Sequence, residues 1–155
     1  MRDTGWKGLI MDAMLGSIAK RVRLMGVDTL YMRDESDGDI VAIVEETGRW
    51  VVTRDKQLAE RTSPSSLLLE TDDPDEGWDT LLNWLSVMGV KLEPGSRCSV
   101  CNTPLVSVEP KTVEHRVPED VIERGEEVWM CKGCQRVYWK GSHWPRIMEY
   151  APDGY

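Results

Sequence analysis

The chain has 155 residues, of which 41% are apolar and 30% are charged, and its formal net charge is −8. This length allows one hydrophobic core, or one core with a small additional module, and the composition is ordinary for a globular protein. The acidic balance excludes binding of nucleic acid through overall charge, so an anionic ligand would have to meet local arginines and lysines or a bound metal. Most of the excess lies in residues 62–96, which carry one lysine and seven acidic residues. We interpret that segment mainly as a solvated helix face.

No apolar run in the sequence is long enough to cross a bilayer. The residues before the first expected strand form a short polar lead-in and do not resemble a signal peptide. We therefore expect a soluble, cytoplasmic protein without a membrane partner.

The first part of the chain alternates between short apolar runs and segments with helical periodicity. Between Met14 and Met25, for example, apolar residues recur with 3–4–3 spacing, which predicts a helix with one buried stripe. The expected strands are 8–11, 27–32, 49–53 and 66–70, and the expected helices are 14–25, 38–47, 56–61 and 75–88. This fourfold alternation predicts an α/β fold with a mainly parallel sheet that is covered on both faces.

A linker at 93–96 separates this segment from a stretch with short β-prone pieces and turns. The sequence therefore predicts a main domain over 8–92 and a smaller module over 97–148. Residues 1–7 and 149–155 are expected to be terminal tails.

Acidic residues follow each of the expected strands. In an open parallel sheet, ligands bind beyond the carboxyl ends of the strands, and carboxylates at that edge are the ligands that Mg²⁺ and Mn²⁺ prefer. The residues at this edge are Asp12, Asp37, Asp39, Asp55, Asp72 and Asp73. Aspartate is also a good helix cap, so capping alone is the alternative interpretation for each of them.

Two arginines are candidates for phosphate binding. Arg54 stands beside Asp55, where it could balance the carboxylates or donate paired hydrogen bonds to a substrate phosphate. Arg23 could do the same, or it could be a surface arginine whose aliphatic stem covers the core.

The four cysteines form two C-x₂-C pairs, Cys98 with Cys101 and Cys131 with Cys134. In an intracellular chain such pairs favour metal binding over disulfides, and four thiolates complete a tetrahedral, structural Zn²⁺ site. The weaker alternatives are an iron–sulfur centre and a redox pair. The long spacing between the pairs predicts a β-hairpin insertion over 102–130.

Aromatic and cationic residues mix directly after the second pair. Such residues can stack on bases and contact phosphates in single-stranded RNA, or they can pack the small module onto the main domain. The candidate RNA contacts here are Trp139, Lys140, His143 and Trp144.

Four segments resemble one known family. "MDAMLGSIAKRVRLMGVDTLY", "ETGRWVVTRDKQL", "RCSVCNTPL" and "CKGCQRVYWKGSHW" are similar to the PIN-like RNase domain at the C-terminus of the Mut-seven exonuclease (Mut7-C). The similarity covers residues 8–148. It implies a PIN-like three-layer α/β/α nuclease with a C-terminal zinc ribbon that cleaves RNA with acid-bound Mg²⁺ or Mn²⁺.

By motif, Asp12 and Asp55 match the acidic positions of that family. Asp37 is the better third match, and Asp39 and Asp72 are further candidates. The leading hypothesis is thus a metal-dependent endoribonuclease that cleaves phosphodiester bonds with metal-activated water, with Arg54 beside the acids.

A rival hypothesis is a non-catalytic RNA- or ribosome-associated zinc-ribbon module, in which the acids only cap helices. In either case we expect single-stranded RNA as a partner, and the ribosome or an rRNA precursor is a further candidate.

Overall fold

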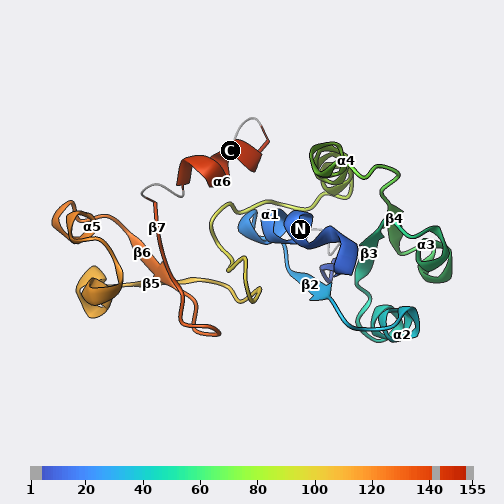
Figure 1. Ribbon diagram of the computed structural model, residues 1–155, viewed down its shortest axis with the longest axis horizontal. Coiled ribbons are helices and arrows are strands. Elements are labelled where there is room, and N and C mark those ends of the chain that lie inside the picture. Colours follow the sequence, from blue (N-terminus) through green and yellow to red (C-terminus); the bar gives the residue numbers. More distant parts are fainter. Residues whose placement is uncertain (1–4, 141–143, 153–155) are drawn as a thin grey trace.

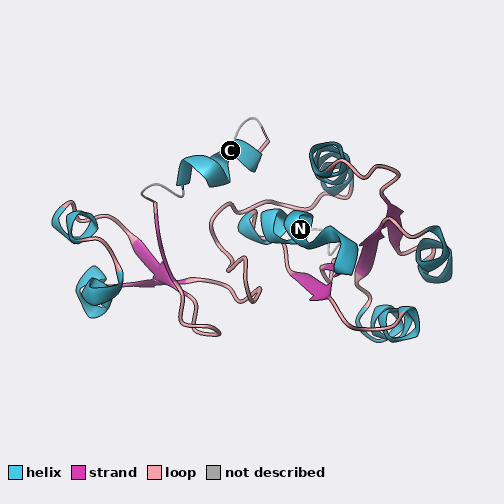
Figure 2. Ribbon diagram, in the orientation of Figure 1, coloured by secondary structure: helices cyan, strands magenta, loops and turns pink. Residues whose placement is uncertain are grey.

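A parallel sheet organises the first half of the protein (Figures 1 and 2). The computed structural model describes residues 5–140 and 144–152. Within these residues the sheet has the strand order β2-β1-β3-β4. Its strands are β1 (Leu9–Asp12), β2 (Thr29–Met32), β3 (Trp50–Thr53) and β4 (Ser66–Leu68). All neighbouring strands pair in parallel, as the alternating pattern predicts.

A helical segment follows each strand and covers one face of the sheet. The segments are η1 (Ala13–Leu15) with α1 (Gly16–Leu24), α2 (Asp37–Thr47), α3 (Lys56–Thr62) and α4 (Pro74–Val87). The expected helix over 14–25 therefore begins as a short 3₁₀ turn and continues as α1. The predicted α/β fold with a parallel sheet is confirmed.

Alternation along the strands divides the core into two layers. Leu9 and Met11 on β1 pack against α1 and α4, in a cluster with Val52 of β3. Ile10 and Val51 point to the opposite face, where they pack with residues of α2 and α3. Helices therefore cover both faces of the sheet, which gives the three-layer arrangement expected for a PIN-like domain.

The strand order fixes where a ligand site can form. The chain moves from β1 to β2 on one side and reaches β3 on the other side of β1. The order therefore reverses between β1 and β3, and in open α/β sheets the crevice for ligands lies at such a reversal, beyond the carboxyl ends of the strands.

The C-terminal module has a sheet of its own, with antiparallel order β5-β6-β7 over the described residues. The strands are β5 (Val106–Val108), β6 (Val128–Met130) and β7 (Val137–Trp139). The ends of the predicted insertion 102–130 do pair as antiparallel strands. Between them lie helical segments that were not predicted, η2 (Pro110–Arg116) and α5 (Glu119–Glu123), which enclose a small core with β6.

The helix α6 (Trp144–Tyr150) packs against the α/β core. Ile147 is 8% exposed and belongs to the main apolar cluster. The Trp78 indole donates to the carbonyl of Tyr150 at 3.1 Å, and the Arg21 guanidinium lies 4.5 Å from the centre of the Tyr150 ring. The boundary expected after residue 148 therefore falls inside α6.

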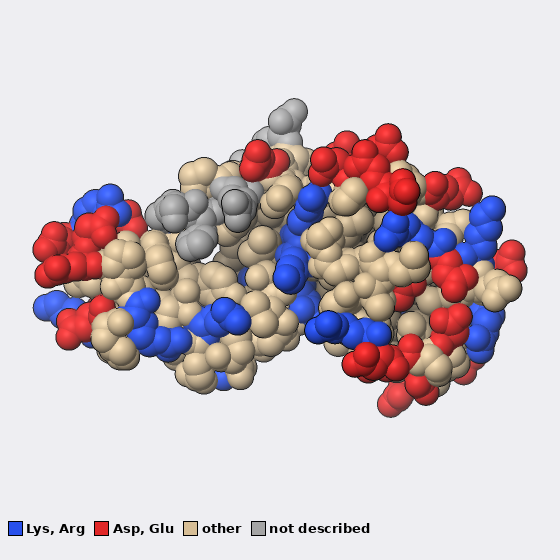
Figure 3. Space-filling view, in the orientation of Figure 1, with Lys and Arg blue, Asp and Glu red and all other residues tan. Residues whose placement is uncertain are grey.

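The surface charges follow the uneven distribution in the sequence. Figure 3 shows acidic side chains gathered over the region of α4, where residues 72, 73, 75, 76 and 79 are all exposed. Arg21 forms an ion pair with Asp75 there, at 3.0 Å. No helix in the described part of the chain is both long enough and apolar enough to cross a bilayer.

Candidate active site and cysteine metal centre

Asp12 and Asp55 lie at the reversal of strand order, where β1 and β3 end. Asp12 is the last residue of β1 and caps η1, accepting a hydrogen bond from Met14 N at 3.3 Å. Asp55 follows β3 and caps α3, and its Oδ1 accepts from Gln57 N at 2.9 Å and Leu58 N at 3.4 Å. Both carboxylates therefore act as helix caps at the edge where the sequence predicts a metal site.

Thr53 connects these two acids. Its side chain is fully buried at the end of β3, and its hydroxyl donates to Asp12 Oδ2. The same oxygen accepts a hydrogen bond from Asp55 N at 3.0 Å. One hydroxyl thus holds the Asp12 carboxylate beside the backbone that carries Asp55, although the two residues lie far apart in the sequence.

Asp37 and Asp39 have different surroundings at the start of α2. Asp39 is exposed and forms a capping box with Ser36, in which its Oδ2 accepts from Ser36 N at 3.1 Å. Asp37 is half-buried in the first turn, and among the described residues its carboxylate has no hydrogen-bond partner. Of the two, Asp37 is therefore the carboxylate with more oxygen lone pairs left for a metal.

Arg54 and Asp72 line the same cavity, which has a volume of about 490 Å³ and lies between the ends of β3 and β4. Arg54 donates to the carbonyl of Met14 at 2.9 Å, and its Nε is buried without a partner among the described residues. Asp73 caps α4, whereas Asp72 is exposed and does not cap the helix. The arginine therefore lies between the Asp12 loop and the acidic start of α4.

The carboxylates share one edge of the sheet without closing into a tight cluster. Over the described residues, the only group of three or more His, Cys, Asp or Glu side chains with ligand atoms within 4.8 Å of one another is the four cysteines. Mg²⁺ is usually held by one or two carboxylates together with water and substrate phosphates. Asp12 Oδ1 accepts one capping bond and keeps a lone pair, and the capping bonds of Asp55 both go to Oδ1, which leaves its Oδ2 available. Asp12 and Asp55 therefore fit such an ion as a partial ligand set.

The four cysteines fit a closed tetrahedral metal site. Cys98 Sγ lies 3.7 Å from Cys134 Sγ, and Cys101 Sγ lies 3.2 Å from Cys131 Sγ. A Zn–S bond of about 2.3 Å requires sulfur atoms about 3.8 Å apart in a tetrahedron, so small movements would seat the ion. These residues could therefore hold a metal such as zinc.

The two cysteine loops have the same backbone design. In each loop the first cysteine's N–H donates to the carbonyl five residues on, and its carbonyl accepts from the N–H four residues on. That fourth residue has a positive φ in both loops, 71° for Asn102 and 67° for Gln135. Gly133 has no room for a side chain, since a Cβ there would lie 2.5 Å from Thr103 Oγ1. The matched loops place the four sulfur atoms on a common centre.

The surroundings of the sulfur atoms differ in their effect on ionisation. The Thr103 hydroxyl, 3.3 Å from Cys101 Sγ, lowers the pKa of that thiol to about 6. Burial raises the pKa of Cys134 to about 11. The Tyr138 hydroxyl lies 3.0 Å from Cys98 Sγ, and burial followed by that contact raises the pKa of Tyr138, so the phenol stays protonated beside the sulfur.

The first cysteine loop is docked on the α/β domain through two side chains. The Arg23 guanidinium donates to the carbonyls of Ser99 at 3.2 Å and Val100 at 3.1 Å, and to the carbonyl of Thr29 at 3.0 Å. Asn102 Oδ1 accepts from Thr29 N at 3.0 Å. Because Arg23 is only 8% exposed and its donors serve these carbonyls, the structure gives no support to the prediction that it contacts RNA.

Asp28 and Arg49 extend this junction. Two parallel hydrogen bonds of 3.0 and 3.1 Å join the Arg49 guanidinium to the Asp28 carboxylate. Asn102 Nδ2 donates to Asp28 Oδ1 at 2.7 Å. Burial opposes ionisation of Asp28, but the bonds from Arg49 and Asn102 outweigh it and hold the pKa of that carboxyl below its ordinary value.

The junction and the acids lie at opposite ends of the strands of the parallel sheet. Thr29 begins β2 and pairs in register with Leu9, whereas Asp12 at the far end of β1 pairs with Met32. The cysteine loop contacts the amino-terminal ends of the strands, which lie about 10 Å from their carboxyl ends in strands of this length. The cysteine centre is therefore placed to support the sheet and not to act on a ligand at the acidic edge.

One family of known proteins matches nearly the whole chain. A family model, the Mut7-C RNase domain, matches residues 7–151. The chain belongs to the Mut7-C RNase domain family. Searches of curated proteins and of solved structures give no match. Membership confirms the resemblance inferred from the motifs, and it indicates a nuclease-like role with RNA as the substrate.

Apart from Arg23, the predicted RNA contacts of the Mut7-C chain follow one another in the sequence from the end of β7. Trp139 packs against the small core between the second sheet and its helical insertion. Lys140 is exposed at the end of β7. His143 lies outside the described residues, and Trp144 begins α6 with a side chain that is not described. For Trp139, packing within the module is the role that the geometry supports.

Sequence reasoning missed the residues that connect the sites of this Mut7-C domain. Thr53 stands directly before Arg54 and Asp55, and its position as the last buried residue of a strand was a usable signal. Asn102 directly follows Cys101, and asparagine tolerates the left-handed conformation found there. Neither residue could be paired with its partner before the strand register was known.

Proposed function

We propose that this Mut7-C domain is a metal-dependent endoribonuclease, acting in the cytoplasm on single-stranded RNA. The observation that carries the proposal is the link from Asp12 through Thr53 to Asp55 at the reversal of strand order. The Asp12 carboxylate, held by this buried hydroxyl, and the neighbouring Asp55, whose backbone N–H donates to the same hydroxyl, offer an anchor for a hydrated divalent cation at that crevice. Asp37 completes the ligand set in this proposal, and Asp39 or Asp72 assists.

Mg²⁺ or Mn²⁺ held there would supply water activation and neutralise charge on the phosphate. The chain's own residues then orient the substrate. Arg54 retains donors beyond its bond to Met14 O, and its position beside Asp72 suits a non-bridging phosphate oxygen. Thr53 keeps the Asp12 carboxylate in a fixed rotamer, because its hydroxyl is buried and occupied on both sides.

The cysteine cluster is proposed to hold structural Zn²⁺. Four thiolates leave no open coordination position for substrate or water. The cluster also lies at the edge of the sheet away from the acids, and its first loop is bonded to β2. Zinc would therefore stabilise the fold without entering the reaction.

A non-catalytic RNA- or ribosome-associated module is the second candidate function. It is favoured by one observation, namely that Asp12, Asp55 and Asp39 all accept backbone hydrogen bonds at helix starts. In that case the acids would serve only as helix caps, and the chain would bind RNA without cleaving it.

The exchange of Asp12 for asparagine separates these functions, because asparagine retains a capping oxygen but loses the charge that binds a cation. Labelled single-stranded RNA is incubated with Mn²⁺ and either the wild type or Asp12→Asn. We expect products with a 5′-phosphate and a 3′-hydroxyl from the wild type, and a rate lower by roughly 100-fold in the variant, since a mispositioned centre loses about that factor.

Asp79→Asn, a change of an exposed acid on α4, is the matched control and should cleave like the wild type. Mn²⁺ should also raise the melting temperature of the wild type and of the control, but much less that of Asp12→Asn. Equal cleavage by the wild type and Asp12→Asn would remove the nuclease proposal and leave the binding module.

A further inference from the structure

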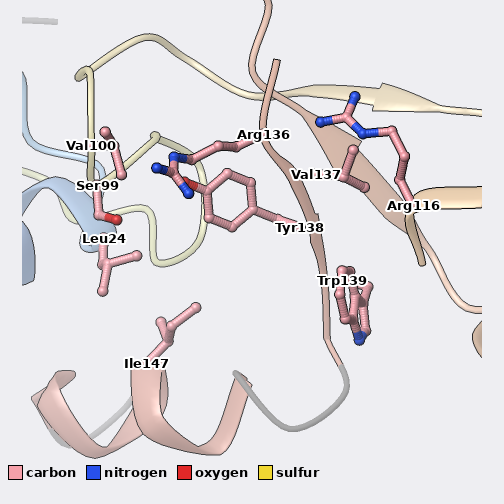
Figure 4. Close-up of a pocket in the computed structure, with 9 residues that line it drawn as sticks. All are labelled: Leu24, Ser99, Val100, Arg116, Arg136, Val137, Tyr138, Trp139 and Ile147. Atoms are coloured by element: carbon pink, nitrogen blue, oxygen red, sulfur yellow. The ribbon is translucent and has the colours of Figure 1, made fainter. Parts of the chain in front are cut away.

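A second cavity lies where the two modules meet, with a volume of about 510 Å³. Its walls come from Leu24 at the end of α1, Val100 in the first cysteine loop, strand β7 and Ile147 of α6 (Figure 4). A volume of this size is typical of sites for small organic ligands. It is distinct from the acidic edge, because the first cysteine loop contacts the opposite end of the sheet.

The charge of this cavity is opposite to that of the chain. The protein carries a net −8, yet the described residues that line the cavity include Arg116 and Arg136 and no acidic side chain. Both arginines are exposed. The Arg116 guanidinium also donates to the carbonyl of Gln135, which restricts its motion. Figure 4 draws Arg136 on the Tyr138 side of β7 and Arg116 on the Val137 side, so positive charge lies on both sides of the strand. Positive charge at a cavity of an acidic protein indicates an anionic ligand.

The remaining walls are apolar and aromatic. In Figure 4 the Tyr138 ring projects from β7 toward Leu24 and the first cysteine loop, and the Arg136 guanidinium lies on the same side of the strand. The Tyr138 hydroxyl is held 3.0 Å from Cys98 Sγ, so the ring is fixed by the cysteine centre. Val100 is 48% exposed beside it, although it is apolar. A ring and apolar side chains next to an arginine suit a planar base attached to a phosphate.

We propose that this cavity binds one nucleotide of single-stranded RNA, with the base against the Tyr138 ring and the phosphate on Arg136. The inference rests on the proposed function in taking RNA as the ligand, but it adds a binding site at the edge of the sheet away from the acids. RNA held there would increase the time that a strand spends on the protein. The residues of the site include Arg136 and Tyr138, neither of which the sequence singled out.

The test is the affinity of the zinc-loaded full chain for a short fluorescein-labelled single-stranded RNA, measured by fluorescence anisotropy without added Mg²⁺ or Mn²⁺. Arg136→Gln should weaken binding by about tenfold, the effect of one charge-assisted hydrogen bond. The slope of log affinity against log salt should fall by about 0.7, because one phosphate contact is lost. Lys132→Gln, at an exposed lysine of the same module outside the cavity, should leave the affinity within twofold.

Tyr138→Leu tests the base contact, and we expect a loss of about fivefold or more for a lost stacking partner. Tyr138→Phe should bind like the wild type, since it keeps the ring. Zinc content measured on each variant shows that the cysteine centre is intact. Equal affinity of Arg136→Gln, Lys132→Gln and the wild type would overturn the proposal and would leave the cavity to another occupant, such as a protein partner.

The outcome is independent of the nuclease proposal. If Arg136→Gln weakens RNA binding but no RNA is cleaved with Mn²⁺, this site stands and the nuclease function fails. If cleavage depends on Asp12 and all variants of the cavity bind RNA equally, the nuclease function stands and this site fails.

Discussion

The contact between the first cysteine loop and the α/β domain can be tested with one substitution, Asn102→Gly. Glycine accepts the positive φ of 71° at this position, so the backbone remains unstrained while the amide is lost. Two hydrogen bonds disappear, one from Thr29 N at 3.0 Å and one to Asp28 Oδ1 at 2.7 Å. The loss of stability therefore measures what these two hydrogen bonds contribute to the contact between the first cysteine loop and the α/β domain.

The expected loss of stability follows from the hydrogen-bonding groups that the substitution leaves unpaired. Thr29 is fully buried, so its N–H would lose its partner at a cost of about 1–3 kcal/mol. The bond to Asp28 adds less, about 0.5–1 kcal/mol, because the Asp28 side chain is 37% exposed and water screens it. The expected total is about 1.5–4 kcal/mol. For a chain of this length that corresponds to a melting temperature lower by about 5–12 °C.

Thermal unfolding followed by circular dichroism, with zinc in excess, is the assay. Gln135→Gly is the matched control, since Gln135 has the same place in the second loop and a φ of 67°. Among the described residues its side chain bonds only to the carbonyl of Lys132. The control should lower the melting temperature by no more than about 3 °C. If both variants melt at the same temperature, Asn102 does not join the two modules and the reasoning is wrong.

Two further substitutions test Thr53 and Asp28. Thr53→Val removes the buried hydroxyl between Asp12 and Asp55, so we expect a stability loss of about 1–2 kcal/mol and a smaller rise of melting temperature on addition of Mn²⁺; an unchanged response to Mn²⁺ would contradict the link. The pKa of Asp28 is held below its ordinary value, so its contribution to stability is present above about pH 4 and is lost as the pH falls through the folded value. Urea unfolding should therefore show a deficit for Asp28→Asn at pH 7 that shrinks below pH 4, and a deficit that does not depend on pH would argue against the Asp28–Arg49 pair.

Local patterns were sufficient to predict most of the α/β domain. The periodicity of Leu15, Ile18 and Val22 predicted α1, and all three residues are buried. Short apolar runs predicted the strands, and the alternation of elements predicted their parallel direction. These features depend on neighbours in sequence, where side-chain spacing alone decides which face is buried.

The contacts that join distant segments could not be predicted in this way. Arg23 bonds to the carbonyl of Val100, 77 residues away, and nothing near Arg23 in the sequence indicates that partner. The helices η2 and α5 were missed because they lie among valines that favour strands, and their stability comes from packing on β6. For the acids, the sequence alone shows that Asp12 and Asp55 follow their strands, but the buried hydroxyl that joins Asp12 to the backbone of Asp55 depends on the register of β1 with β3.

The positions of the acidic site and the cysteine cluster decide how an experiment that removes zinc should be interpreted. The first cysteine loop holds the amino-terminal edge of β2 through Asn102, and the acids follow the carboxyl ends of β1 and β3. Because β1 pairs with both β2 and β3, loss of the junction would loosen the strand that carries Asp12 without touching a proposed ligand. Lower activity after zinc removal would therefore not make zinc a catalytic metal. A catalytic role would require activity to fall while the melting temperature stays constant, and a structural role requires the two to fall together.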